Sequence, residues 1–318
     1  MKIINLISTY NHSYKKKYEE VLYEWLENKK NNIKESTYIK YLYEIENNII
    51  PYFKNTNFKN LNTNSILNYF NLEDIKKLSN STKSNLLIII KSSINFGIER
   101  KWIKKFNDIE LKFEKKKNEI TYLSKIEQNI IENYVRNNMN IRNLMILVAL
   151  YTGIRIGELC GLKGNDIDFI NNTISINKTV QRIKDTSNSN KKTKLVVGIP
   201  KTKSSNRIIP VPEFIIELLK RYIINNNYYI FTNSSKPKDP RTVEKYFTNI
   251  LKKLDINNYN FHSLRHTYAT RLRERKVDIK VISELLGHSD WRITQSIYVH
   301  ASFELKKESI KELCELWS

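Results

Sequence analysis

The stretch HSLRHTYATRL, residues His262–Leu272, has the pattern of a helix that presents two nitrogen-bearing side chains to one anion. His262 and Arg265 are three residues apart, about 60° around a helix, so both can face the same group. A separate apolar stripe would seat the helix in a core; it consists of Leu264, Tyr268 and Leu272. The segment therefore predicts a buried helix with an anion-binding face.

A second segment upstream, TGIRIGELCGL at Thr152–Leu162, pairs an arginine with a glutamate. Gly153 can end the preceding helix in the left-handed conformation. Arg155 then starts the next short helix, and Glu158 lies one turn further on a similar face. Taken alone, an exposed ion pair of little energetic value is the simpler interpretation.

A third segment downstream, LLGHSDWRITQSIYVH at Leu285–His300, carries a histidine and a tyrosine in a helix–turn–helix context. Gly287 is expected to end one helix and His288 to lie in the turn. Tyr298 then lies about two turns inside the next helix. As one of 19 tyrosines, Tyr298 taken singly is more simply a packing residue.

The fourth segment, PKTKSSNRIIP at Pro200–Pro210, is a basic turn between two strand-like runs. A lysine at such a tip is usually only solvated. Lys201 and Lys203 gain interest if the tip points into a site.

Together the four segments predict a phosphate pocket built from two arginines, two histidines and a lysine. Fixed cationic donors can stabilise the charge that develops on a phosphodiester in its transition state. No carboxylate cluster for magnesium, Walker A motif or zinc ligand set is visible in the sequence. The spacing of His262 and His266 permits zinc, but Ser263 stands where the metalloprotease motif has glutamate, and no third ligand is evident. An enzyme without metal needs a protein nucleophile, and a tyrosine hydroxyl qualifies.

Composition agrees with a polyanionic partner. The chain of 318 residues has 54 Lys plus Arg against 33 Asp plus Glu, a net charge of +21. Two cysteines, Cys160 and Cys314, suit a reducing cytosol and make a disulfide framework implausible, so we expect a cytoplasmic protein. No apolar run approaches the ~20 residues of a membrane span, and residues 1–17 lack the apolar stretch of a signal peptide.

The fold class expected from the pattern is mainly α, in two parts. Residues 1–112 have helical periodicity, including a helix from Ser36, a possible cap, to Pro51, which would stop it. A charged stretch at 113–121 is expected to link the parts. Residues 122–318 mix helices with one small antiparallel sheet whose strands we expect at Thr173–Ile176, Leu195–Pro200 and Arg207–Val211.

The order Arg, Lys, His-x-x-Arg, His, Tyr resembles the tyrosine recombinase (phage integrase) family. The phrases TGIRIGEL, HSLRHTYAT and LLGHSD…IY match its motifs over roughly residues 120–305. The resemblance extends more loosely to the first part, which looks like the family's core DNA-binding domain. It implies a catalytic domain at 122–318 and a DNA-binding domain at 1–112.

The resemblance also implies a role for each site residue. Tyr298 would attack the scissile phosphate and form a 3′-phosphotyrosyl link, and Arg155 and Arg265 would clamp the non-bridging oxygens. His262 would act as general base, and His288 would hydrogen-bond the phosphate. Three further positions complete the prediction: Glu158 would support the pocket, Lys201 (or Lys203) would protonate the leaving 5′-oxygen, and His266 would be structural. Neither metal nor ATP is required, because each phosphodiester is exchanged for a phosphotyrosine and then restored.

The family acts on duplex DNA as a tetramer, which implies double-stranded recombination sites and further copies of this chain as partners. The segment Phe303–Ser318 is expected to dock on a neighbouring subunit or to pack on its own domain. Only about 12 residues precede the first predicted helix, which leaves no room for an arm-binding domain and favours a Xer-like or transposon-type layout.

Two alternatives remain open from the sequence alone. One is a DNA-relaxing topoisomerase of the tyrosine type, and the other is a DNA-binding regulator on a degenerate integrase fold. The two-part layout favours recombination over relaxation, and the full set of catalytic residue types argues against the regulator. The target DNA sequence and the biological task of the exchange are not readable from the chain.

Overall fold

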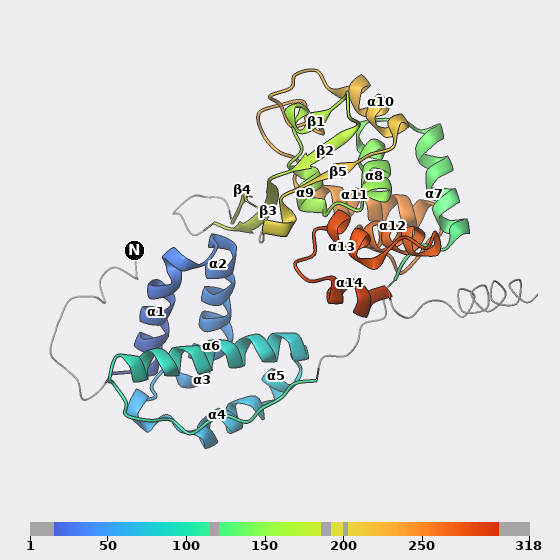
Figure 1. Cartoon of the computed structure of the whole chain (residues 1–318). Coiled ribbons are helices and arrows are strands. Elements are labelled where there is room, and N and C mark those ends of the chain that lie inside the picture. Colours follow the sequence, from blue (N-terminus) through green and yellow to red (C-terminus); the bar gives the residue numbers. More distant parts are fainter. Residues whose placement is uncertain (1–15, 115–120, 186–191, 200–202, 299–318) are drawn as a thin grey trace, which may run out of the picture. The chain divides into compact units, whose positions relative to one another are not determined.

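The computed structural model (Figure 1) describes residues 16–114, 121–185, 192–199 and 203–298, with the backbone alone at 203, 293 and 296–298. The chain divides into two compact units, Met1–Asn118 and Glu119–Ser318. The boundary falls inside the segment expected to be a linker, while the roles expected of the two domains stay predictions. Among the described residues, no helix combines the length and apolar content that a membrane span needs.

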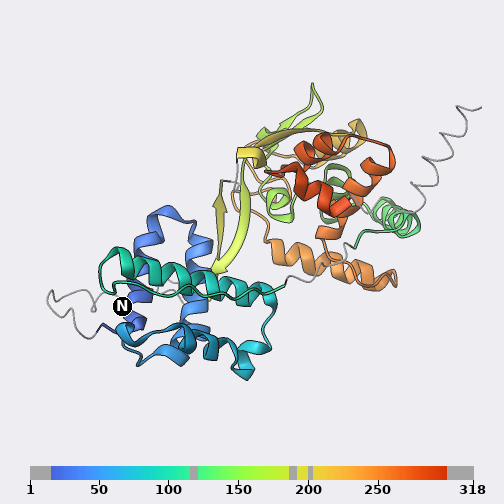
Figure 2. The ribbon, with the colours of Figure 1, turned by 60° about the horizontal axis from the view of Figure 1, so that its bottom comes forward.

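The regular elements of the N-terminal unit are all helices in its described residues, and residues 101–114 follow them without regular structure. Its α-helices are α1 (Tyr18–Lys29), α2 (Glu35–Glu44), α3 (Ile50–Phe53), α4 (Thr63–Phe70), α5 (Glu73–Lys76) and α6 (Asn80–Glu99). Figure 2 shows α6 running across the unit. Two hydrogen bonds fasten α1 to α6, from Trp25 Nε1 to Ser92 Oγ at 3.0 Å and between Tyr18 and Ser93 at 2.9 Å. An aromatic and aliphatic core fills the space between the helices.

Pro51 does not stop the second helix, contrary to the sequence prediction. A π-helical turn, Ile45–Ile49, joins α2 to α3, and Pro51 falls in the first turn of α3. A proline is tolerated there because its missing N–H has no partner to lose. Ser36 also does not cap this helix, since α2 begins at Glu35 and Lys34 holds the cap position.

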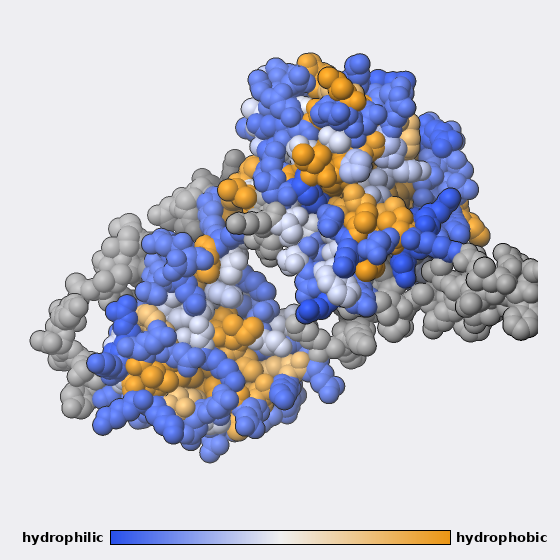
Figure 3. All heavy atoms as spheres, in the orientation of Figure 1, coloured by the Kyte–Doolittle hydropathy of each residue, from blue (hydrophilic) through white to orange (hydrophobic). Residues whose placement is uncertain are grey.

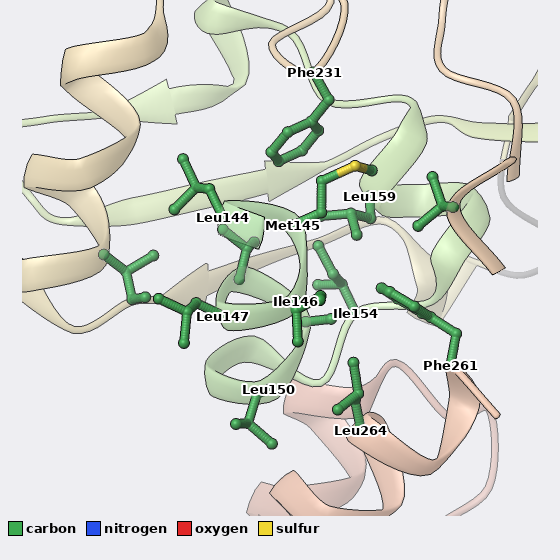
Figure 4. Close-up of a cluster of buried hydrophobic side chains, with 14 of the residues drawn as sticks. Leu144, Met145, Ile146, Leu147, Leu150, Ile154, Leu159, Phe231, Phe261 and Leu264 are labelled. Atoms are coloured by element: carbon green, nitrogen blue, oxygen red, sulfur yellow. The ribbon is translucent and has the colours of Figure 1, made fainter. Parts of the chain in front are cut away.

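The C-terminal unit surrounds helix α8 (Ile141–Thr152), which is buried on nearly all sides. Figure 4 shows its leucine, isoleucine and methionine side chains packed against Leu159, Phe231, Phe261 and Leu264. The other helices of the unit are α7 (Lys125–Asn137), α9 (Ile156–Cys160), α10 (Glu213–Tyr222), α11 (Pro240–Lys253), α12 (His262–Glu274), α13 (Ile279–Leu286) and α14 (Trp291–Tyr298). A helix that is apolar all round belongs in a core, so α8 is the fixed element around which the candidate site is built.

The strands form two separate antiparallel sheets in the described residues, where one was expected. β2 (Thr173–Ile176) lies between β1 (Ile167–Asp168) and β5 (Arg207–Pro210), whereas β3 (Thr179–Lys184) pairs only with β4 (Thr193–Gly198). The mainly α fold with antiparallel strands is confirmed, and the expected strand at Thr173–Ile176 has the predicted bounds. β1 and β3 were missed because β1 has two residues and the β3 sequence TVQRIK alternates only weakly.

Candidate active site

The turn between α8 and α9 places Arg155. Gly153 ends α8 in the left-handed conformation with φ of 63°, as predicted. A side chain would not fit, because a Cβ at Gly153 would lie 2.4 Å from the ring of Tyr268. The chain therefore turns tightly beneath the α12 helix and resumes as α9 with Arg155 at its N-cap.

Glu158 holds Arg155 by both its backbone and its side chain. One carboxylate oxygen accepts from the Arg155 backbone N–H at 3.0 Å, and the other accepts from its Nη1 at 2.8 Å. Arg155 Nη2 donates to the carbonyl of Gly287 at 3.3 Å. The Arg155 side chain stays 36% exposed, so its guanidinium remains reachable from solvent.

Arg265 comes from the first turn of α12 and is buried, with 3% of its surface exposed. Its Nη1 donates to the Gly153 carbonyl at 2.8 Å, and its Nη2 donates to the Leu286 carbonyl at 2.7 Å. Arg155 and Arg265 therefore both bind the single turn at Leu286–Gly287. Two arginines that are 110 residues apart in sequence are brought to one place by backbone carbonyls at the end of α13.

His288 follows this turn and joins the same group. Gly287 ends α13 in the left-handed conformation with φ of 66°, and Arg265 Nη2 lies 2.8 Å from His288 Nε2. Burial, and then the neighbouring arginines, lower the pKa of His288 to about 3. His288 is therefore neutral across the physiological pH range.

His262 opens α12 and is exposed, one turn before Arg265. Its ring meets that of His266 edge to face, with centroids 4.7 Å apart. Burial of part of the ring, the His266 ring and the guanidinium groups of Arg265 and Arg155 lower the pKa of His262 to about 4. Within the described part of the chain, no group of three or more metal-ligating side chains accompanies this histidine pair.

Tyr298 lies on α14 (Trp291–Tyr298), which begins directly after Asp290. The Asp290 carboxylate accepts from the backbone N–H of Arg292 at 2.9 Å and caps this helix. Only the backbone is described at Tyr298 and Lys203, and Lys201 lies outside the described residues, as does the segment Phe303–Ser318. The roles of these residues stay predictions.

Arg207 is a third arginine of this region, and sequence analysis missed it. Its Nη2 donates to Glu158 at 3.0 Å, its Nε to the Leu285 carbonyl at 2.7 Å and its Nη1 to the Ser205 carbonyl at 3.2 Å. Its side chain is only 7% exposed. Although burial raises the pKa of Glu158, the hydrogen bonds and charges of Arg207 and Arg155 outweigh it and lower that pKa. Nothing local in RIIP marks the arginine of a strand as buried, so only the fold reveals it.

We expect Arg207→Ala to lower the free energy of unfolding by about 3–5 kcal/mol, the usual effect of removing one partner from a buried ion pair. The change would leave the Glu158 carboxylate buried with half of its partners and would strip two carbonyls of their donor. Urea unfolding of the full chain at neutral pH measures the loss. Arg292→Ala is the control, because Arg292 is 77% exposed and 3.9 Å from Asp290, and an exposed pair contributes at most about 1 kcal/mol. Equal losses of unfolding free energy for both variants would refute the stabilising role of the buried Arg207–Glu158 pair.

Two family models match this chain. Residues 116–304 match the phage integrase family, and residues 17–73 match the SAM-like N-terminal domain of phage integrases. A XerC-like tyrosine recombinase of Caldanaerobacter subterraneus subsp. tengcongensis is 34% identical over 191 residues, 54% of this chain and 49% of that protein. The match thus spans about half the length of this curated relative.

Two solved structures share the fold. The Tn1549 transposon integrase in complex with transposon right end DNA aligns with a TM-score of 0.76 at 20% identity, over 94% of this chain and 100% of that one. A lambda integrase tetramer bound to a Holliday junction aligns with a TM-score of 0.62 at 18% identity, over 90% of this chain and 84% of that one. With a family match across more than half of its residues and the family's arginines gathered at one turn, the chain belongs to the phage integrase family of tyrosine recombinases.

Proposed function

We propose that this protein is a site-specific DNA recombinase that cuts and rejoins duplex DNA through a 3′-phosphotyrosyl intermediate. One observation carries the proposal: Arg155, Arg265 and His288 converge on the turn at Leu286–Gly287, and the helix that follows this turn carries Tyr298. A tight cluster of guanidinium groups next to an imidazole is suited to a phosphodiester, whose oxygens accept hydrogen bonds and carry negative charge.

In the proposed reaction the Tyr298 oxygen attacks phosphorus while the bond from phosphorus to the 5′-oxygen breaks. His262 accepts the phenol proton, and Lys201 or Lys203 gives a proton to the leaving 5′-oxygen. The 5′-hydroxyl of a second strand then attacks the phosphotyrosine and releases the tyrosine. Because one ester replaces another at each step, the exchange needs no energy source such as ATP. The arginines would supply the positive charge that metal ions supply in other phosphoryl-transfer enzymes.

Arg155 and Arg265 would stabilise the charge that builds on the non-bridging oxygens. A donor that other contacts hold in place is worth about 3–4 kcal/mol in comparable sites. Glu158 would keep Arg155 oriented, since it binds both the backbone and the guanidinium of that residue. Its low pKa keeps this support charged at neutral pH.

The depressed pKa of His262 predicts an unusually flat pH profile. With a pKa of about 4 in the free chain, the imidazole stays unprotonated, as a base must be, well below neutrality. We expect the rate of adduct formation at sub-saturating DNA to change less than about twofold between pH 7.5 and 5.5. At the ordinary histidine pKa of 6.5 only about a tenth of the ring would be neutral at pH 5.5, so a tenfold fall in rate would argue against this assignment.

Duplex DNA is the proposed partner, supported by the net charge of +21 and by the DNA held in the related Tn1549 integrase structure. We propose that residues 1–112 bind DNA, that 113–121 link the domains and that 122–318 are catalytic. Hydrophilic side chains cover much of each unit in the view of Figure 3. A homotetramer is proposed on the example of the lambda integrase tetramer, and a cytoplasmic location on the cysteine usage.

Salt dependence tests the electrostatic part of this proposal. If the lysines contact phosphates, the logarithm of the binding constant falls against the logarithm of salt concentration by about 0.9 per contact. With six or more contacts, binding of a random duplex should weaken at least about 10³-fold between roughly 50 and 200 mM salt. A nearly flat filter-binding series over this range would contradict phosphate-dominated binding.

The decisive experiment looks for a covalent protein–DNA adduct. A tiled set of nicked duplexes covering the DNA that flanks the gene would be incubated with the full chain in EDTA. A nick next to the cleavage point lets the short 5′-hydroxyl strand diffuse away and traps the intermediate. The proposal expects an adduct on an SDS gel with at least one duplex, and it fails if a set that spans both flanks and supports binding gives none.

A further inference from the structure

Both ring nitrogens of His288 are hydrogen-bonded within the protein. Arg265 Nη2 lies 2.8 Å from Nε2, and the hydroxyl of Thr294 lies 2.7 Å from Nδ1. A guanidinium has donors and no acceptor, so Nε2 must be the acceptor of the first bond. A neutral imidazole carries one N–H, which therefore lies on Nδ1 and donates to the Thr294 oxygen.

This arrangement has a chemical consequence for phosphate binding. A phosphate oxygen only accepts hydrogen bonds, whereas Nε2 of His288 offers a lone pair. In this structure His288 therefore cannot donate to the phosphate, although the family resemblance implies that it hydrogen-bonds the phosphate. The proton must move from Nδ1 to Nε2, and Arg265 must exchange its bond to His288 for one to the phosphate.

Thr294 is suited to this exchange because its hydroxyl can donate or accept. Thr294 is fully buried, with 0% of its surface exposed, so water does not reach it to replace the bond. When Nδ1 loses its proton, rotation of the hydroxyl hydrogen lets Thr294 donate to the same nitrogen. The ring plane need not move, and neither buried group is left without a partner.

The position of Thr294 adds a second effect. It lies on α14 four residues, about one turn, before Tyr298. The bond to His288 therefore fastens the helix that carries the proposed nucleophile to the arginine turn. Valine has nearly the shape of threonine but no hydroxyl oxygen. Thr294→Val would therefore remove the hydrogen bond to His288 while filling the same space.

We propose that Thr294 is a positioning residue whose hydroxyl holds His288 in either of two tautomers, as acceptor from Arg265 before DNA binds and as donor to a phosphate oxygen afterwards. The proposal rests on the proposed function. The ring gains one proton from solvent at Nε2 and gives up its Nδ1 proton to solvent while the contact with Thr294 is transiently open, so no net proton is taken up.

Nitrogen NMR of the full chain, labelled with ¹⁵N-histidine, tests both states. The assignment comes from the resonances lost in His288→Gln. In the chain without DNA, we expect a protonated Nδ1 and an unprotonated Nε2. With Tyr298→Phe bound to the duplex that gave the covalent adduct, we expect the reverse. An Nε2–H form before binding, or an unchanged or doubly protonated ring after binding, would overturn the proposal.

Two variants separate positioning from simple packing. Thr294→Val should slow adduct formation at saturating DNA at least tenfold and change DNA affinity less than threefold, whereas Thr294→Ser should stay within threefold of the unaltered chain. In a His288→Ala background, Thr294→Val should have no further effect on rate, since contacting residues are not additive. A full tenfold loss in that background would assign Thr294 to packing alone.

Absence of any adduct with the unaltered chain would refute the proposed function. The NMR of the chain without DNA would still show whether His288 carries its proton on Nδ1.

Discussion

Tyr298→Phe is expected to abolish the covalent DNA adduct and to leave DNA binding within about twofold. The substitution removes one oxygen, and that oxygen is the atom that would bond to phosphorus. Where catalytic residues act as a unit, as in a serine protease, removal of the nucleophile lowers kcat by about 10⁶-fold. Even a much smaller effect would take the adduct below detection on a gel. Binding depends on phosphate contacts that a phenol hydroxyl does not supply.

A matched control makes this result specific. Tyr259→Phe also removes a phenol oxygen from the C-terminal unit, where its hydroxyl donates to Glu127 at 2.8 Å. We expect that variant to form the adduct at a normal rate. An adduct that survives Tyr298→Phe, with mass spectrometry placing DNA on another residue, would refute Tyr298 as the nucleophile.

The parts of the site that sequence could predict are those built by local rules. Gly153 and Gly287 both end helices in the left-handed conformation, as glycine after an apolar helix predicts. His262 and Arg265 share one helix, so their spacing fixes their relation. The pairing of Arg155 with Glu158 was expected for the same reason. The prediction of an exposed pair of little energetic value was wrong, because Glu158 is buried and also binds Arg207.

The parts that sequence could not predict depend on contacts between distant segments. Arg207 reaches Glu158 across 49 residues, and Arg265 reaches the Gly153 carbonyl across 112. The periodicity of apolar residues in a sequence does not indicate which backbone carbonyl a guanidinium will bind. The tautomer of His288 is of the same kind, since it is set by Arg265 on one side and Thr294 on the other. The π-helical turn before Pro51 was missed for a different reason, because sequence rules treat proline as a helix stop.

Arg265→Lys is expected to slow adduct formation by about 10²–10³-fold, although the charge is kept. The guanidinium spans three acceptors at once: the Gly153 carbonyl, the Leu286 carbonyl and His288 Nε2. An ammonium is a single point with three hydrogens, and it cannot reproduce the planar fork or its bidentate fit to a phosphate. The turn that places Arg155 would also lose a tether. Single-turnover rates of adduct formation, compared at saturating DNA, measure the effect.

Arg271→Lys is the matched control for that change because Arg271 lies on the same helix and its guanidinium is also held by three hydrogen bonds, although its side chain is more exposed, at 21%. Arg271 donates to Gln128, Glu274 and the Leu123 carbonyl, away from the arginine turn. If the loss in Arg265→Lys came only from weaker packing of α12, both variants would lose rate in proportion to their loss of unfolding free energy. We expect comparable destabilisation in urea but a large rate loss in Arg265→Lys alone. Equal rate losses would mean that Arg265 acts by holding the fold, and the phosphate clamp would have to be assigned elsewhere.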